Sequence, residues 1–526
     1  MASQDDLARN APPPATGAAY LDPVVRALVA APRADGREVP PSRQIFVNRN
    51  LRMDKIEAVG FDMDYTLAIY RLLQLEELSF EMTLERLVRQ RGWTDRLLSL
   101  RYTPDFVIRG LVVDKLTGNL IKMDRHAHVG RAYHGLRPLP REERYRLYRD
   151  ERVDLSSPRF AWIDTLFALP EASLFALVIE QEDRPEHPVD YGRLFTDIRE
   201  TMDGIHADGS LKTRVKADLS RFILRDPELG PALHKLRSTG KRLFVLTNSH
   251  LDYTEAVMRH VLDGVLPEYP SWRNYFDAVI TAARKPSFFS SADPFVELDP
   301  QGNRIDVEVR AFERGHTYAG GNRGDLERLI GAGGDRVLYV GDHIYGDILR
   351  SKKSSQWRTC LVIEELQREI EWLERNRDAL EEVAGLEDLR LRVDDEAAAH
   401  RAALNGVERR LLRLGPDDPA HAALEAERAR MKRELESLRA ALRDVNARIG
   451  ALHARVEDGY NRYWGLTFKE GNENSRIGEQ IEDYACIYTS RVSNFVHYSP
   501  MQYLRVQRRA MAHEISALRL APWGAP

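Results

Sequence analysis

The sequence has few of the features that mark secreted or membrane proteins. Among its 526 residues only Cys360 and Cys486 are cysteines, and they lie far apart in the chain. This argues against a disulfide scaffold or a cysteine-based zinc site and fits a reducing compartment. No stretch approaches the roughly 20 uninterrupted apolar residues that a membrane span requires. The polar start, with Asp5 and Asp6, is unlike a secretory signal. We therefore expect a cytoplasmic protein with no membrane partner.

The chain also lacks an excess of positive charge. Its 77 Lys and Arg residues against 81 Asp and Glu residues give a formal net charge of −4. A dedicated nucleic-acid-binding protein usually carries a basic excess, so no nucleic-acid partner is expected. Hydrophobic residues make up 43% and charged residues 30% of the chain, which allows a sizeable core beneath a well-solvated surface. The length predicts about three domains, at roughly 150 residues each.

Changes in composition divide the chain into units. The stretch rich in Ala and Pro at the start is expected to be flexible. The gap between the first and second apolar runs of the core is far longer than one crossover needs, which indicates an inserted unit. We expect a flexible tail (1–40), a catalytic core in two pieces (41–75 and 231–370), an inserted cap (76–230), a helical hairpin (371–458) and a C-terminal segment packed on the core (459–526).

Short apolar runs in the core each stop at a polar residue. They occupy residues 56–61, 243–246, 276–281 and 337–341. Runs of four to six apolar residues suit strands buried on both faces of a parallel sheet. Candidate helices, such as residues 231–238 and 253–262, separate them. The alternation predicts an α/β fold with an open parallel sheet, whose ligands bind at the carboxyl ends of the strands.

The predicted hairpin carries a heptad-like seam. Its apolar residues recur in alternating steps of four and three, at Met431, Leu435, Leu438, Leu442, Val445, Ile449, Leu452 and Val456. This spacing over more than three heptads is typical of coiled coils. The sequence GPDDP at 415–419 separates this helix from an earlier one, which predicts an antiparallel pair. The hairpin either packs on the body of the same chain or mediates self-association.

Two carboxylates, Asp62 and Asp64, follow the first core strand directly. Two acidic groups this close are costly unless a cation or a reaction needs them. They would suit a nucleophile and a general acid/base beside a hard divalent metal. The alternative is a loop in which two aspartates cap turns.

Other strand ends extend the set. Asp342 and Asp347 supply further carboxylates, which suit Mg²⁺ together with a phosphate oxygen. His343 has no second His or Cys at ligand spacing nearby, which argues against zinc. Thr247 and Lys285 could hold phosphate oxygens, although Thr247 could instead be a helix N-cap and Lys285 a surface charge. Jointly these residues favour metal-assisted phosphoryl transfer.

The same positions carry ordered motifs of the haloacid dehalogenase (HAD) superfamily. The segments that resemble them are FDMDYTLA at 61–68, LTNS at 246–249, RKP at 284–286 with FF at 288–289, and GDHIYGD at 341–347. The flanks FVNR at 46–49, ILRSKK at 348–353 and WRT at 357–359 more narrowly resemble the cytosolic purine 5′-nucleotidases, the HAD-IG type. The similarity covers about residues 41–370, whereas residues 371–458 match poorly.

The resemblance implies a Rossmann-like core with a cap inserted after the first motif. It implies that Asp62 attacks the phosphate of a purine nucleoside monophosphate to form an aspartyl-phosphate, with phosphoryl transfer to a nucleoside as an additional activity. Asp64 would protonate the leaving ribose oxygen and then activate water. Mg²⁺ would sit between Asp62, the carbonyl of Asp64 and Asp342, with Asp347 supporting its outer shell. Thr247 and Lys285 would hold the phosphate.

One edge of a predicted helix at 193–209 carries Arg199, Asp203 and His206. These side chains could read and stack on a purine, or they could be an i,i+4 ion pair beside an exposed His. The resemblance favours the purine reading. The substrate-binding positions that it implies are Phe167, Arg199, Asp203, His206, Lys212 and Ser249, with Asn248 beside the phosphate. IMP and GMP would be preferred, because Asp203 could accept from an N1–H that adenine lacks.

The chain departs from the family at one place. Animal members have an activator pocket with basic residues; here Gln480 and Tyr484 remain recognisable but a basic position is Asp483. An acidic side chain would repel a triphosphate, so we expect weak or absent activation by ATP. Related enzymes form dimers or tetramers, so a homo-oligomer is expected. Two alternatives remain: a HAD phosphatase acting on another ester such as a sugar phosphate, and a helical scaffold with an unused core.

Overall fold

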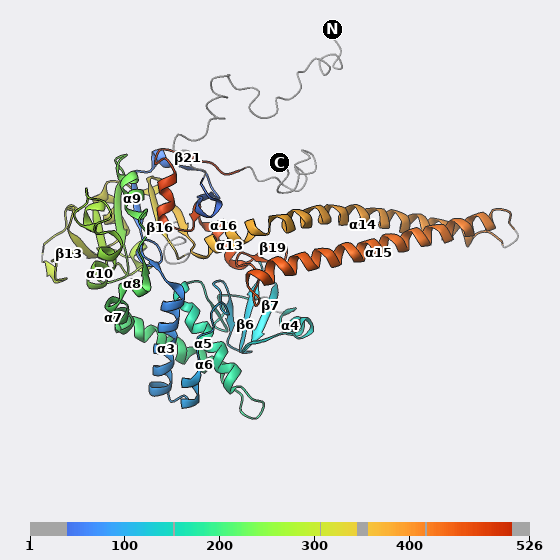
Figure 1. Ribbon diagram of the computed structural model, residues 1–526, viewed down its shortest axis with the longest axis horizontal. Helices are drawn as coiled ribbons and strands as arrows, with labels where there is room; N and C mark the ends of the chain where they lie inside the picture. The colour runs from blue at the N-terminus through green and yellow to red at the C-terminus, as the bar shows by residue number, and fades with distance from the viewer. Residues whose placement is uncertain (1–38, 151–152, 306, 344–355, 416–417, 508–526) are drawn as a thin grey trace, which may run out of the picture.

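The computed structural model describes residues 39–150, 153–305, 307–343, 356–415 and 418–507 (Figure 1). The predicted tail lies almost wholly outside these ranges, as do Asp347 and the last part of the predicted C-terminal segment. The α/β class is confirmed. A mostly parallel sheet forms the centre, a small antiparallel sheet lies in the insert, and two long helices follow toward the C-terminus.

The central sheet has ten strands in the described ranges. Seven consecutive strands run parallel, and antiparallel strands complete both edges. The spatial order is β1 (Phe46–Val47), β20 (Ile487–Thr489), β17 (Arg358–Val362), β16 (Val337–Gly341), β3 (Ala58–Phe61), β11 (Arg242–Leu246), β12 (Ala278–Thr281), β15 (Thr317–Gly320), β13 (Phe295–Leu298) and β14 (Arg304–Ile305). The four apolar runs predicted from the sequence are β3, β11, β12 and β16.

Burial explains why these runs are apolar throughout. Every residue of β3, β12 and β16 is buried, as expected for strands covered on both faces. Gly60 is needed because a Cβ there would lie 2.2 Å from the ring of Phe244 on β11. Phe61 lies beside both Val245 and Val340, so the carboxyl ends of β3, β11 and β16 meet at one edge of the sheet.

Helices connect the strands of the core. The two helices expected at 231–238 and 253–262 are α9 (Leu229–Arg237) and α10 (Leu251–Leu262). Farther along the chain are α11 (Arg323–Ile330) and α13 (Glu365–Arg375). No helix in the described ranges is both long and apolar enough to cross a membrane.

The insert leaves and rejoins the core through a short ribbon, in which β4 (Ile69–Tyr70) pairs antiparallel with β10 (Ile223–Leu224). Its sheet has the order β8 (Arg137–Pro138), β7 (Val129–His134), β6 (Asn119–Met123), β5 (Val112–Asp114) and β9 (Phe160–Trp162). Its helices are α3 (Leu72–Arg91), α4 (Arg141–Tyr148), α5 (Leu169–Glu182), α6 (Tyr191–Ala207), α7 (Ser210–Ala217) and α8 (Leu219–Phe222). Figure 1 shows α3, α5 and α6 side by side below the core.

The predicted hairpin consists of α14 (Arg377–Leu411) and α15 (His421–Tyr460), which pack along each other. Leu435 of the predicted seam is buried against Ala397 and Leu404 of α14. Figure 1 shows both helices extending away from the body of the molecule. The seam therefore joins helix to helix, and the alternative in which it packs on the body is wrong for the outer part of the hairpin.

The segment after the hairpin returns to the core. It contains two paired strands, β18 (Lys469–Glu470) and β19 (Glu473–Asn474), then α16 (Arg476–Tyr484) and β20. Its last strand, β21 (Tyr503–Leu504), pairs with β2 (Leu51–Arg52). Trp464, Val492 and Phe495 are buried in the main hydrophobic core. The sequence did not reveal that this segment supplies a strand of the central sheet.

Candidate active site

The aspartate at the end of β3 lies in a buried ion pair. Asp62 is 8% exposed, and its Oδ1 lies 2.9 Å from Nζ of Lys285. The side chain of Lys285 is only 4% exposed, and its ammonium also donates to the hydroxyl of Tyr339 at 3.0 Å. The alternative in which Lys285 is a surface charge is therefore wrong. A cation adjoins the carboxylate that the sequence marks as a nucleophile.

Two hydroxyl groups from distant parts of the chain orient Asp64. The Tyr70 hydroxyl donates to Oδ1 at 2.6 Å, and the Ser249 hydroxyl donates to Oδ2 at 2.8 Å. The hydroxyl of Tyr253 lies 2.8 Å from that of Tyr70. Tyr65 has a φ of 54°, a left-handed conformation that is strained for a large side chain and recurs in functional turns. Both oxygens of Asp64 are thus held in place by side chains.

The end of β11 contributes Thr247 and Asn248. Thr247 is fully buried, and its Oγ1 accepts from the N–H of Ser249 at 3.1 Å. His250 is the N-cap of α10, so the alternative in which Thr247 caps that helix is wrong. The side chain of Asn248 accepts from the N–H of Lys285 at 2.6 Å and donates to its carbonyl at 2.9 Å. Asn248 therefore fixes the main chain that carries the active-site ammonium.

Asp342 follows the end of β16 and is 5% exposed. Because β16 and β3 are neighbours in the sheet, Asp342 and Asp62 come from adjacent strand ends. The carbonyl of Asp342 accepts from the guanidinium of Arg109 at 3.1 Å. Arg109, which belongs to the insert and is 2% exposed, makes a two-pronged ion pair with Glu365 at 2.6 and 3.0 Å. The insert is thereby tied to the core next to Asp342.

The carboxylates present suit Mg²⁺. Asp62 and Asp342 are buried, and Mg²⁺ needs only one or two carboxylates besides carbonyl, water or phosphate oxygens. In the ranges that the structure describes, no group of three or more His, Cys, Asp or Glu residues could hold a metal. His343 lies 3.2 Å from Asp164, not in a cluster of zinc ligands. Asp347 lies outside the described residues, so its metal role stays a prediction.

The insert carries the residues expected to contact the base. Helix α6 ends at Ala207, and Gly209 beyond it has a φ of 74°, as the sequence predicted for the end of this helix. Nε of Arg199 lies 2.7 Å from Oε2 of Glu171 on α5. Arg199 therefore pairs with Glu171 and not with Asp203, the partner expected from the i,i+4 spacing. Asp203 itself is exposed.

His206 lies on the same edge of α6. Burial lowers its pKa, and the neighbouring charge of Lys212 acts in the same direction. The residue is partly buried, so the alternative of an exposed histidine is wrong. Lys212 donates from Nζ to the hydroxyl of Ser249 at 3.1 Å, and Ser249 in turn contacts Asp64. A hydrogen-bonded chain thus runs from the insert to the predicted general acid/base.

Phe167 lies between the two halves of the site. Its ring centre is 4.7 Å from that of Tyr65 and 5.5 Å from that of His206, both edge to face. The rings of Phe167 and His206 therefore touch each other rather than face each other across a gap. A base that stacks on either ring would have to displace the other or lie against its outer face.

Several residues of this site carry no signal in the sequence. Tyr70 contacts Asp64, and Tyr253 contacts Tyr70, because β4 and α10 are brought beside the end of β3. Glu171 and Arg109 reach their partners because the insert folds back onto itself and the core. Only contacts made in the folded chain identify these four side chains.

Gln480 and Tyr484 lie one turn apart on α16. The Gln480 side chain is 3% exposed, and the carbonyl of Asp483 accepts from the Arg49 guanidinium. Weak activation by ATP stays a prediction.

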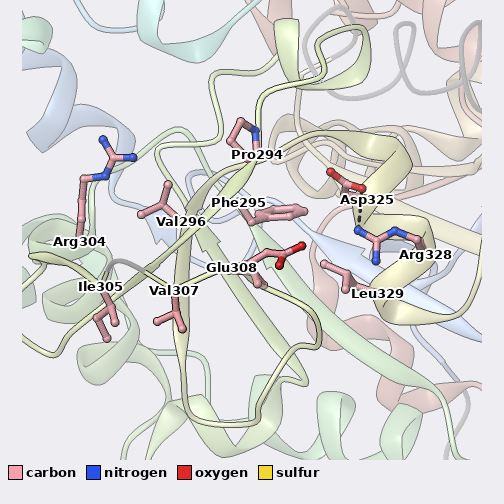
Figure 2. Close-up of a pocket in the computed structure, with 11 residues that line it drawn as sticks. Pro294, Phe295, Val296, Arg304, Ile305, Val307, Glu308, Asp325, Arg328 and Leu329 are labelled. Atoms are coloured by element: carbon pink, nitrogen blue, oxygen red, sulfur yellow. Dashed lines mark hydrogen bonds and ion pairs between the residues drawn. The ribbon is translucent and has the colours of Figure 1, made fainter.

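A cavity of about 560 Å³ lies elsewhere in the molecule (Figure 2). It is lined by parts of β13, β14 and α11, including Phe295, Ile305 and Leu329. Three strands separate β13 from β3 in the sheet, so the cavity is not the site around Asp62. The dashed line in Figure 2 joins Arg328 to Asp325 at 2.8 Å, so this guanidinium is already neutralised.

Comparison with known proteins gives one consistent family. A model of the 5′ nucleotidase family matches residues 45–516. The chain is 29% identical over 480 residues to a 5′-nucleotidase domain-containing protein of Dictyostelium discoideum, covering 90% of this chain and 75% of that one. It is 33% identical over 338 residues to 5′-nucleotidase domain-containing protein 2 of Homo sapiens, covering 62% of this chain and 64% of the relative.

Similar solved structures include a predicted phosphoglycolate phosphatase from Haemophilus somnus. It is 12% identical, the match covers 59% of this chain and 85% of that one, and the TM-score is 0.27.

Proposed function

Since this chain belongs to the 5′ nucleotidase family, a family of HAD-type phosphomonoester hydrolases, we propose that it hydrolyses purine nucleoside 5′-monophosphates, with IMP and GMP preferred. One observation carries the proposal. The buried Asp62 is paired with the Lys285 ammonium next to an Asp64 whose two oxygens are both held by hydroxyl groups. A nucleophile, an acid/base and a fixed cation are what phosphoryl transfer from an ester needs.

In the first step, a carboxylate oxygen of Asp62 attacks phosphorus and the bond from phosphorus to the ribose O5′ breaks. Asp64 gives its proton to that O5′ as the nucleoside leaves. In the second step, Asp64 takes a proton from water, whose oxygen attacks the aspartyl-phosphate and releases phosphate and free Asp62. A nucleoside hydroxyl in place of water would give the additional phosphotransferase activity.

The rest of the site would bind the phosphate and the metal. Lys285 and Thr247 would hold the phosphate oxygens, with Asn248 keeping the Lys285 main chain in position. Mg²⁺, held by Asp62, Asp342 and the Asp64 carbonyl with support from Asp347, would offset the charge that develops on the phosphate.

The base would bind along the insert. Lys212 and Ser249 lie on the path between α6 and Asp64, which suits contacts to the ribose. Asp203 is exposed on the same edge and could accept from the N1–H of a 6-oxopurine. Phe167 and His206 offer aromatic surface beside it.

The test is phosphate release from IMP, GMP, AMP and sugar phosphates, with Mg²⁺ and with EDTA. We expect Mg²⁺-dependent release that is fastest from IMP and GMP and is lost in Asp62→Asn. Millimolar ATP in the same assay should change the rate little. Faster release from AMP would contradict the base preference, and release from sugar phosphates alone would keep the mechanism but discard the purine assignment. No release from any ester would leave the scaffold alternative.

We also propose that the protein is a homo-oligomer, a dimer or a tetramer. The support is the hairpin, whose two helices extend away from the body and present a long surface to another copy (Figure 1).

A further inference from the structure

The buried carboxylate of Glu171 has no part in the chemistry derived above. It lies in the first turn of α5 and is 2% exposed. Its Oε2 contacts Nε of Arg199 on α6 at 2.7 Å. That nitrogen is buried, whereas the Arg199 side chain as a whole is 41% exposed. The guanidinium is thus held at its inner nitrogen by an ion pair, since within the described residues this nitrogen makes no hydrogen bond of normal geometry.

A second contact restricts the same guanidinium. Its central carbon lies 5.2 Å from the centre of the Phe195 ring, within the range of a cation–π interaction. Phe195 and Arg199 are one turn apart on α6, so the ring covers the side chain from the N-terminal side. The ion pair with Glu171 at Nε and the Phe195 ring beside the guanidinium carbon both restrict where the Arg199 side chain can lie.

The other oxygen of Glu171 points to a role beyond stability. Within the described residues, Oε1 is buried and has no hydrogen-bond partner. Burial raises the pKa of Glu171, although the charge of Arg199 acts to lower it. A buried pair that leaves an acceptor unsatisfied is a poor way to stabilise a fold, since an apolar pair of similar size often does as well or better.

The place of Glu171 in the chain connects it to the reaction centre. Phe167, four residues earlier, contacts both His206 and the Tyr65 ring that adjoins Asp64. The start of α5 therefore lies next to the aromatic side of the site.

We propose that Glu171 is a positioning residue that holds Arg199 at Nε. The two terminal amino groups of Arg199 are then free to donate to a base with two adjacent hydrogen-bond acceptors. The proposal rests on the proposed function and adds the residue that sets the base preference. The 6-carbonyl and N7 of a 6-oxopurine are such a pair, and a guanidinium binds them in two-pronged fashion. Adenine offers only N7 and turns a donor toward the arginine.

The experiment compares Glu171→Gln with the wild-type protein on IMP, AMP and ribose 5-phosphate, which has the same sugar and phosphate but no base. We expect kcat/KM for IMP to fall about 10- to 100-fold, mainly through KM, because the charged hydrogen bond from Arg199 to the base is misaligned. AMP should lose less, and ribose 5-phosphate should change by no more than about two-fold. Glu182→Gln, a carboxylate at the other end of α5, is the matched control and should behave as wild type.

Two further variants remove ambiguity. Arg199→Gln should show the same substrate-dependent loss, and the double variant Glu171→Gln, Arg199→Gln should be no worse than Arg199→Gln alone, because the two residues act as one unit. Activity on ribose 5-phosphate reports whether each variant is folded. If Glu171→Gln does not fold, Arg199→Lys, which keeps the charge but has no Nε, should give the same loss on IMP.

The outcomes separate the two levels of proposal. A wild-type protein that cleaves ribose 5-phosphate but not IMP or GMP would overturn the proposed function, and this inference with it. If the wild-type protein cleaves IMP, any of three results would overturn the inference alone. Glu171→Gln could cleave IMP normally, it could lose activity equally on all esters, or its loss could add fully to that of Arg199→Gln.

Discussion

Single side chains do two different kinds of work in this site. Asp62 and Asp64 are the groups that would exchange bonds and protons, whereas Lys285, Ser249 and Tyr70 keep them in position. Lys285 does more than hold Asp62, because its ammonium would also offset the charge that develops on the phosphate. A fixed charge in a buried place is worth more than the same charge in water, since the local dielectric is low.

Replacing Lys285 by methionine keeps the volume and removes the charge. We expect kcat with IMP and Mg²⁺ to fall about 100- to 1,000-fold, the range seen when one preorganised electrostatic group is removed. Arg284→Met, at the preceding position, is the matched control. The Arg284 side chain is 76% exposed, and its guanidinium lies 3.8 Å from the carboxylate of Asp293. Initial rates of phosphate release, with circular dichroism to verify folding, give the answer. A loss below ten-fold in Lys285→Met would show that this ammonium is dispensable.

Residues that directly follow a strand are the part of the site that the sequence predicts best. Asp62, Thr247 and Asp342 follow apolar runs, so the edge at which they meet could be predicted from the pattern. Glu171 could not be predicted, because its partner lies on another helix and nothing in the local pattern specifies how α5 packs on α6. The family resemblance named Arg199 but not the carboxylate that holds it.

At the scale of elements, the start of α3 follows the ribbon that joins the insert to the core. Glu76 in its second turn is 8% exposed and accepts from the Tyr102 hydroxyl at 2.7 Å. Burial raises its pKa to about 7, and the nearby Glu365 of α13 adds to the effect. The pKa of Glu364 is raised to about 8, also mainly by burial. The region where α3 meets the core therefore contains two carboxyl groups whose pKa values lie close to neutral pH.

These groups predict a pH dependence of stability. The pKa of Glu76 is higher in the folded state than the ordinary value of 4.5, so the folded state binds more protons and its stability falls as pH rises from about 4.5 to 7. Glu76→Gln removes this term. We expect the variant to exceed wild type by about 1–3 kcal/mol at pH 8 and to match it near pH 4.5, as measured by urea unfolding. Glu77→Gln, on the next position of α3, should show no such difference; an equal difference at both pH values would refute the assignment.

Elements were predicted unequally. The strands β3, β11, β12 and β16 were found because a strand buried on both faces leaves a continuous apolar run. The strand β20 has only three residues and one of them is partly exposed, so nothing marked it as a member of the central sheet. Short strands gain their structure from the neighbours with which they pair, and a local pattern does not contain these.

At the scale of the whole molecule, the hairpin and the catalytic body have separate hydrophobic cores. The outer seam of α14 and α15 forms its own clusters, around Leu435 and around Leu424, whereas the residues of the site lie on the main core. A heptad seam that packs helix on helix needs no support from the body along its outer part. The hairpin should therefore be able to unfold locally without loss of the reaction.

Leu435→Asp tests this separation by placing a charge in the seam, where the leucine is 4% exposed. Burying an unpaired carboxylate costs several kcal/mol, so we expect loss of helix by circular dichroism and rapid proteolysis within residues 395–445. Phosphate release from IMP should stay within about two-fold of wild type, because among the described residues the outer seam forms clusters separate from the core that carries the site. Leu412→Asp is the control, since that leucine is 87% exposed and already faces water.

Light scattering on the same samples reports the oligomer: a lower mass in Leu435→Asp alone assigns self-association to the hairpin, and an unchanged mass assigns it to the body. Loss of activity together with the hairpin would mean that the two parts fold as one unit.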